Sequence, residues 1–474
     1  MDELINGTEG RVRLVVRFWG IRGSIPTPGP TTARYGGNTS CVEVRGDGGD
    51  LFILDCGTGI RELGQALLAD TTVPSRIHIL IGHTHWDHIQ GFPFFTPVFL
   101  PGVEIHLYAP IGFQHGIEAA LAGQMQHAYF PVTLQDLSSR IHYTELEEGS
   151  FRIGTCLIET QYLNHTAPTI AYRLTEGSTS IAYVTDHEPF WTPAGPDFAH
   201  PGDQRHIEFI QDADLVIHDA QYSDEEYVTK IGWGHSPVGY VRDVALAAHV
   251  KRLALFHHDP THDDAWVDAC VRDMQTAIAA RNSTMEVFAA AEGIVLEVHG
   301  EGAYAVTNKN SALLRRSIAG ERVLLVSPHA SDVTAIERML VEDNLVLMPA
   351  SDPDTALKQA KQFSPSLVIM DASLLETPPG HFGDRLRTVV GTPQLPIMVL
   401  TDTSDIVNTH PAANDAVSDY ITRPFNPPML RTRVRACLAR TLANPQPPAA
   451  PPNGDDMPRE GGAPAPPHRT TMRP

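Results

Sequence analysis

The segment IGHTHWDHIQG, residues 81–91, constrains this chain more than any other stretch. A short apolar run, RIHIL, precedes it and predicts a β-strand. Four metal-binding side chains, His83, His85, Asp87 and His88, then follow within six positions. Imidazole and carboxylate groups together suit Zn, Mn or Fe(II), and a close pair of such ions is compatible with this donor set. The tight spacing favours a metal site over a chance cluster.

Further side chains of the same kinds stand at or beside the ends of other apolar runs: Asp55, His165, Asp186, Asp219, His235, His257 and His258. Open α/β folds place their sites at the carboxyl ends of strands, so recurrence at several strand ends predicts one shared site. Taken singly, Asp55 could cap a turn and His165 could be structural. His235 stands before a helix that Ser236 and Pro237 are expected to begin.

The composition limits the class of partner. The chain has 474 residues, which suggests about three domains, and its net charge of -21 disfavours a broad nucleic-acid or anionic membrane surface. Its five cysteines form no CxxC pair and are expected to be reduced, as in a cytoplasmic protein. No apolar run reaches the ~20 residues that span a bilayer, so no membrane partner is expected.

Residues 12–299 resemble the metallo-β-lactamase superfamily of metallohydrolases. The resemblance rests on five motifs, which are met by Asp55, by the cluster at 83–88, and by His165, Asp186 and His257. It implies an α/β fold with a four-layered αββα sandwich. Asp186 is an aspartate where antibiotic-hydrolysing members commonly carry cysteine, and His85 stands where flavodiiron relatives carry glutamate. Both of those branches are therefore disfavoured.

The resemblance also implies a site with two divalent metal ions, expected to be zinc, with manganese or iron as alternatives. One ion would be held by His83, His85 and His165. The other would be held by Asp87, His88 and His257, with Asp186 between the two ions. The doublet leaves His258 as an alternative to His257. Asp55 would orient a metal-binding histidine.

The segment GHS, which follows HDAQY, resembles the tRNase Z and PhnP-like phosphodiesterase branch. There a histidine paired with a carboxylate assists the leaving group, and His235 and Asp219 fit these roles beside the catalytic Asp87. We expect a metal-dependent phosphodiesterase for cyclic nucleotides or other small phosphodiesters, rather than for nucleic acid. The alternatives are a thioester or lactone hydrolase, and a non-catalytic scaffold of a phosphorelay.

Strands alternate with helices from residue 321 onward, which predicts a doubly wound (βα)5 unit. It resembles a response-regulator receiver domain, with Asp371 as the phosphoacceptor and Thr401 as the switch hydroxyl. Ser327 and Pro328 stand where the family holds Mg²⁺ with an acidic pair, and Arg423 replaces its lysine. Because Mg²⁺ needs carboxylate or water ligands, we expect a degenerate receiver that docks to a signalling protein or forms a homodimer.

These patterns divide the chain into four parts. We expect a hydrolase domain at residues 1–306, a linker at 307–320, a receiver-like domain at 321–442 and a tail at 443–474. The tail is rich in Pro, Ala and Gly, has almost no large apolar side chains, and is expected to be disordered.

Overall fold

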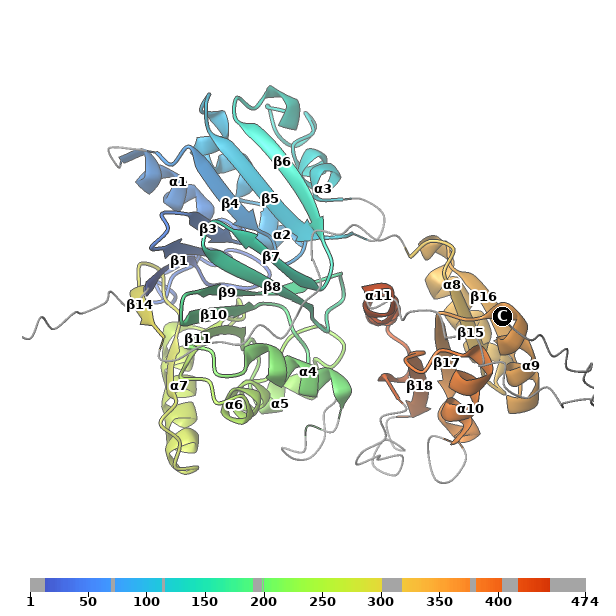
Figure 1. Cartoon of the computed structure of the whole chain (residues 1–474). Helices are drawn as coiled ribbons and strands as arrows, with labels where there is room; N and C mark the ends of the chain where they lie inside the picture. The colour runs from blue at the N-terminus through green and yellow to red at the C-terminus, as the bar shows by residue number, and fades with distance from the viewer. Residues whose placement is uncertain are drawn as a thin grey trace, which may run out of the picture.

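The computed structural model describes residues 13–69, 73–112, 116–190, 198, 200–300, 318–375, 381–402 and 417–443 (Figure 1). The predicted linker lies outside these residues apart from 318–320, and the predicted tail lies outside them apart from Ala443. None of the helices in these ranges combines the length and the apolar composition needed to cross a lipid bilayer.

The first sheet of the amino-terminal unit has seven strands. The strands from β14 through β3 pair antiparallel, and those from β3 through β6 pair parallel. In spatial order the strands are β14 (Val295–His299), β1 (Arg13–Gly20), β2 (Cys41–Gly46), β3 (Leu51–Leu54), β4 (Arg76–Leu80), β5 (Glu104–Pro110) and β6 (Arg140–Leu146).

The second sheet also has seven strands, with β10 to β13 parallel and β7 to β10 antiparallel. In spatial order the strands are β13 (Glu286–Ala289), β12 (Arg252–Phe256), β11 (Leu215–Asp219), β10 (Thr179–Val184), β9 (Ile170–Glu176), β8 (Cys156–Tyr162) and β7 (Gly149–Ile153). The carboxyl ends of the parallel strands share one edge of the sheet, which is where side chains can converge.

Helices cover the outer face of each sheet, and the two sheets pack on each other (Figure 1). Apolar side chains of α1 (Ile60–Ala69), α2 (Trp86–Ile89) and α3 (Ile117–Gln124) pack on the first sheet. Those of α4 (Pro201–Ile210), α6 (Val238–Ala247) and α7 (Asp264–Ala279) pack on the second, and α5 (Asp224–Tyr227) is a short turn of helix. The predicted αββα sandwich is confirmed.

The carboxyl-terminal unit is a five-stranded parallel sheet with helices on both faces (Figure 1). Its strands in spatial order are β16 (Val346–Ala350), β15 (Arg322–Val326), β17 (Leu367–Asp371), β18 (Ile397–Asp402) and β19 (Asp419–Arg423). On one face pack α8 (Ala330–Leu340) and α11 (Pro427–Ala443). On the other pack α9 (Pro353–Phe363) and α10 (His381–Val390). The predicted doubly wound architecture is confirmed.

Candidate metal centre

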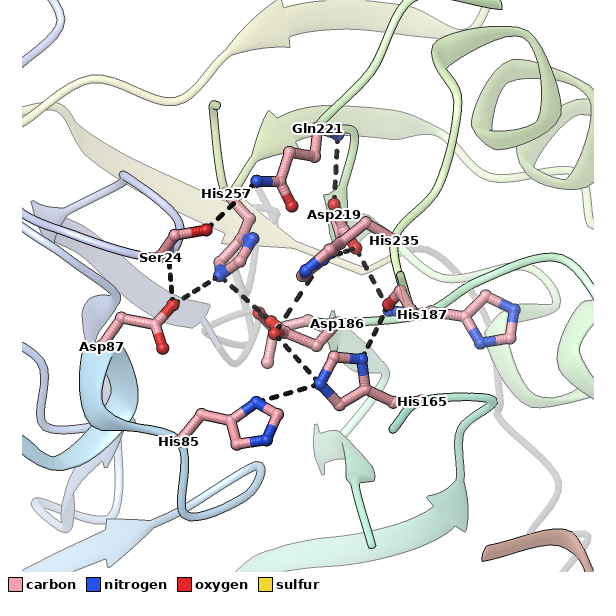
Figure 2. Close-up of polar contacts among 12 residues, drawn as sticks. Ser24, His85, Asp87, His165, Asp186, His187, Asp219, Gln221, His235 and His257 are labelled. Atoms are coloured by element: carbon pink, nitrogen blue, oxygen red, sulfur yellow. Dashed lines mark hydrogen bonds and ion pairs between the residues drawn. The ribbon is translucent and has the colours of Figure 1, made fainter. Parts of the chain in front are cut away.

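The predicted site residues converge because the strands that carry them end at the same place (Figure 2). Asp55 directly follows β3, Asp186 lies two residues after β10, and His257 directly follows β12. All three have positive φ angles, 59°, 55° and 59° respectively, in the left-handed region that residues other than glycine seldom adopt. Such backbone conformations concentrate at functional sites, where they turn a side chain sharply toward its target.

The first group of ligand atoms comes from three histidines and one aspartate. His83, His85, His165 and Asp186 offer nitrogen and oxygen atoms that all lie within 4.8 Å of one another. Asp186 Oδ2 is 3.5 Å from His83 Nε2 and 3.6 Å from His165 Nε2. His83 and His165 are buried, whereas His85 is exposed and faces His165 across 3.2 Å (Figure 2).

The second group surrounds the other oxygen of the same aspartate. Asp186 Oδ1 lies 3.2 Å from His88 Nε2 and 3.1 Å from His257 Nε2. Asp87 Oδ2 is likewise 3.2 Å from His88 Nε2 and 3.1 Å from His257 Nε2. Each carboxylate oxygen of Asp186 therefore faces one group, as a carboxylate shared between two metal ions would.

These residues fit a pair of divalent ions. Both ring nitrogens of His83 are buried and have no hydrogen-bond partner within the described part of the chain, although buried polar atoms normally have one. Burial, and then the nearby His88, hold the pKa of His83 well below its usual range, and burial lowers the pKa of His165 to about 3. Neutral imidazoles with free lone pairs are the form that coordinates metals.

The charged members of the site are also in a metal-binding state, with one exception. Burial opposes ionisation of Asp186, but His257, His88 and His83 hold its pKa well below the usual range. His88 differs, because Asp87, Asp186 and Asp55 together raise its pKa well above normal despite burial. Metal binding would therefore displace a proton from His88, which makes affinity depend on pH.

Neighbouring groups hold two of the histidines in a defined orientation. Asp55 Oδ2 lies 2.7 Å from His88 Nδ1 and accepts a hydrogen bond from Tyr183 at 2.7 Å, while Asp55 Oδ1 accepts one from the Gly82 amide at 2.6 Å. His165 Nδ1 lies 2.8 Å from the Gly234 carbonyl oxygen. In both histidines Nε2 is left facing the site, which is how outer groups usually orient metal-binding histidines.

His235 and Asp219 form a pair beside the two groups (Figure 2). His235 Nδ1 is 3.0 Å from Asp219 Oδ2, and Asp219 also accepts the backbone N–H of His187 at 3.2 Å. Burial disfavours the charged ring, but Asp219, followed by Asp186 and Asp87, raises the pKa of His235 to about 9. The Asp219 carboxylate thus favours the protonated form of the His235 ring.

The histidine doublet divides between two environments. His257 joins the second group, whereas His258 is buried next to Tyr35, with ring centroids 6.2 Å apart, and its backbone pairs with the loop after β1. The backbone is left-handed at His257, directly after β12, so the doublet does not continue the regular alternation of that strand.

Three contacts at the site have no counterpart in the sequence prediction. The Ser24 amide, in the loop after β1, donates to Asp87 Oδ2 at 2.7 Å. Glu188 accepts the backbone N–H groups of Gly232 and Gly234 at 2.6 Å and 2.8 Å. Asn164 precedes His165, and the backbone N–H of Asn164 donates to His187 Nδ1 at 3.3 Å. Only the position of Glu188 just after Asp186 hinted at such a role.

The predicted phosphoacceptor of the receiver domain is already paired with a cation. Asp371 accepts a short ion-pair contact from Arg423, and the same guanidinium donates to Asp332 at 2.6 Å and 3.0 Å. Asp332 belongs to the first turn of α8. Thr401 is buried on β18, and its hydroxyl faces the Asp402 carbonyl oxygen at 3.4 Å. One guanidinium is thus shared by the two carboxylates of Asp371 and Asp332.

Comparisons with known proteins identify both units. A model of the beta-lactamase superfamily domain matches residues 51–258, and a model of the response regulator receiver domain matches residues 323–435. Ribonuclease Z of Bacillus mycoides is 26% identical over 283 residues, which cover 51% of this chain and 87% of that protein.

Two solved structures are also similar. The metallo-beta-lactamase fold protein YhfI from Bacillus subtilis has a TM-score of 0.43 and 18% identity, covering 60% of this chain and 99% of its own. A diphosphatase from the PhnP family has a TM-score of 0.42 and 18% identity, covering 61% of this chain and 99% of its own. Residues 51–258 thus form a beta-lactamase superfamily domain, residues 323–435 form a response regulator receiver domain, and the chain is a metal-dependent hydrolase.

Proposed function

We propose that this protein is a dinuclear metal phosphodiesterase that acts on cyclic nucleotides or other small phosphodiesters. The observation that carries the proposal is the His235–Asp219 pair, held 3.0 Å apart beside the two ligand groups that share Asp186. The thiolate that leaves a thioester needs little help, whereas the alkoxide that leaves a phosphodiester gains much from a proton donor.

The ligand assignments follow the two groups. His83, His85 and His165 would hold one ion, and Asp87, His88 and His257 the other, with Asp186 shared between them. When bound, two divalent ions would supply Lewis acidity and a water nucleophile at neutral pH. Imidazole and carboxylate ligands suit zinc first, with manganese or iron as alternatives.

His235 and Asp219 would supply the proton that the leaving oxygen takes up. Asp219 holds His235 Nδ1 and favours the protonated ring, so Nε2 is the nitrogen that can deliver a proton to the leaving oxygen. General acid help of this kind contributes ~10²–10⁴-fold to the rate. Asp55 keeps His88 in the orientation in which Nε2 faces the site.

Exposed aromatic side chains beside the site support a substrate with a nucleobase. Trp86 lies between His85 and Asp87 and is 76% exposed, and Trp233, next to Gly234, is 56% exposed. Aromatic side chains stack on bases whatever the sequence. The net charge of -21 disfavours a long polyanion as substrate. Because the similar protein from Bacillus mycoides is a ribonuclease, an RNA substrate is the competing outcome.

The decisive experiment is hydrolysis of a cyclic nucleotide, which releases an alkoxide, by the metal-loaded full chain, run beside a thioester, a lactone and a precursor tRNA. We expect phosphodiester turnover that falls by ~10²-fold or more in His235→Ala with metal content unchanged. His299→Ala, which removes a histidine exposed on β14, is the matched control. Turnover confined to the thioester or lactone, or to RNA, would refute the proposal.

For the whole chain we propose the division given by the sequence: a hydrolase domain at 1–306, a linker at 307–320, a receiver-like domain at 321–442 and a tail at 443–474. The spans of the two family models fall within the first and third parts. The receiver-like domain would act by docking rather than by accepting a phosphoryl group, because Arg423 pairs with the expected phosphoacceptor Asp371 and with Asp332. A cytoplasmic setting is supported by five cysteines that are all unpaired.

A further inference from the structure

Helix α11 belongs to the receiver domain but is buried on all sides. Residues 432–439 are buried without interruption, although this stretch includes Arg433 and Arg435. Leu430, Val434 and Leu438 pack in the receiver core. A helix buried all round must be enclosed by more than one body, and in Figure 1 α11 lies on the side of the receiver that faces the sandwich.

The second body is the hydrolase domain. Ala436 and Ala439 belong to the same apolar cluster as Tyr162 and Ile170, between the two sheets of the sandwich. Two ion pairs flank these alanines. Arg435 lies 3.1 Å from Glu147, both being nearly buried, and Arg440 contacts both carboxylate oxygens of Glu148 at 2.8 Å. Paired buried charges of this kind are costly to separate, so the receiver is docked on its own hydrolase domain.

Nearer the amino end of α11, Arg433 reaches the loops that carry the metal ligands. Its guanidinium, 9% exposed, donates to Asn164 Oδ1 at 3.0 Å, to the Phe190 carbonyl at 3.3 Å and to the Tyr420 carbonyl at 2.6 Å. Asn164 precedes His165, and Phe190 lies four residues after Asp186. One side chain of the receiver therefore joins the segments that supply two candidate ligands.

Those two segments are also bonded to each other. The Asn164 side-chain amide donates to the carbonyl oxygens of Glu188 and Pro189 at 3.0 Å and 3.1 Å, and the Glu188 amide donates to the Asn164 carbonyl at 2.8 Å. Arg433 supplies the hydrogen bond to Asn164 Oδ1, the remaining polar atom of that side chain. Removal of the guanidinium would leave this oxygen buried beside the site.

A second contact reaches the loop that carries His235. The Asn426 side-chain amide donates to the Gly232 carbonyl at 3.0 Å. The Gly234 carbonyl faces His165 Nδ1, and a Cβ on Gly234 would lie 2.2 Å from that nitrogen. Movement of this loop therefore changes the support of His165 as well as the position of His235.

We infer that Arg433 and Asn426 are positioning residues for the metal centre, so that the receiver domain completes the active site of its own chain. The inference rests on the proposed ligand set. It assigns to the receiver a structural partner, the loops at 163–166, 187–190 and 232–235, in place of a separate signalling protein. Loss of outer groups that orient metal ligands typically lowers metal affinity or activity ~10–100-fold, and these contacts lie one step further out.

The test measures zinc release from the full-length protein to a chromogenic chelator, which needs no substrate. Arg433→Ala removes the contact to Asn164. Asn426→Asp is nearly isosteric, keeps the oxygen that accepts the Met429 amide at 3.3 Å, and replaces the donor to Gly232 with a carboxylate oxygen that the Gly232 carbonyl repels. We expect both variants to release zinc about tenfold faster than the unmodified protein.

Two control variants separate positioning from stability and docking. Arg431→Ala removes ion pairs to Glu342 and Asp343 inside the receiver, and Arg440→Ala removes a docking contact that touches no metal-bearing loop. Both should release zinc at the unmodified rate. If Arg433→Ala fails to fold, Asn426→Asp decides. The inference is overturned if Asn426→Asp releases zinc at the rate of the unmodified protein, or if Arg440→Ala releases zinc as fast as Asn426→Asp does. Absence of phosphodiester turnover would bear only on the proposed function.

Discussion

Replacement of Asp55 by asparagine tests the ligand orientation most directly. The asparagine has nearly the same volume but cannot accept three hydrogen bonds in the same way. In the native protein one oxygen accepts from Gly82 and the other faces both His88 and Tyr183. Whichever way the amide turns, its NH₂ group meets a donor in this fully buried site.

The expected loss of zinc affinity in Asp55→Asn follows from the loss of the carboxylate that orients His88. Outer groups of this type contribute 10–100-fold to metal affinity, which corresponds to about 1.4 to about 2.7 kcal/mol. A second effect opposes the first near neutral pH. Asp55 is one of the carboxylates that raise the pKa of His88, so its loss makes the proton on His88 easier to displace. The affinity deficit of Asp55→Asn should therefore increase as the pH rises and proton competition disappears in both proteins.

Competition titrations with a zinc chelator at neutral and alkaline pH measure both effects. Tyr183→Phe is the matched control, because it removes one hydrogen bond to Asp55 and leaves the carboxylate and its contact with His88. That variant should lose stability by about 1 kcal/mol, with little change in zinc affinity. A folded Asp55→Asn protein that binds zinc as tightly as the native protein at both pH values would falsify the orienting role.

Three further predictions concern the proton donor, the ligands and the receiver. Asp219→Asn removes the main charge that raises the pKa of His235 to about 9. In the proposed mechanism the protonated ring is the donor, so activity falls as the pH rises through this pKa. The alkaline limb of the kcat profile should therefore move to lower pH in Asp219→Asn. An unmoved limb would separate His235 from proton transfer. Asp87→Ala should lose metal and turnover together, measured by elemental analysis and hydrolysis; full activity with two bound ions would contradict the shared site. Incubation with acetyl phosphate should produce no phosphorylated protein on a phosphate-affinity gel, since Arg423 pairs with Asp371, and a band that disappears in Asp371→Asn would refute this.

The strands and helices could be predicted because most apolar runs are short and end at turn residues. The apolar run RIHIL, which predicts a strand, coincides with β4. Periodicity could not show which strands pair, so the two-sheet arrangement came from the resemblance alone. Local patterns do not encode that β3 and β4 are parallel neighbours while β2 and β3 are antiparallel.

Several candidate ligands could be predicted because they follow an apolar run, whereas the complete ligand set came from the resemblance. Neighbouring residues at a strand end were harder to separate. His257 and His258 lie in different environments, and no sequence pattern indicates that the backbone is left-handed at His257. Asp332 was not foreseen beside Asp371 either, because it comes from the first turn of a helix rather than from the strand end that the family uses.

The contacts between the two domains could not be predicted at all, because their partners are far apart in the chain. Arg433 and Asn164 are separated by 269 positions, and neither lies in a motif. Arg423 and Arg433 act on the same strand. Arg423, at the carboxyl end of β19, pairs with Asp371 and Asp332, and Arg433, on α11, holds the Tyr420 carbonyl near the amino end of β19 together with Asn164. One arginine therefore fixes β19 within the domain and the other links it to the loop of a candidate metal ligand, which suits permanent support of the metal centre better than reversible signalling.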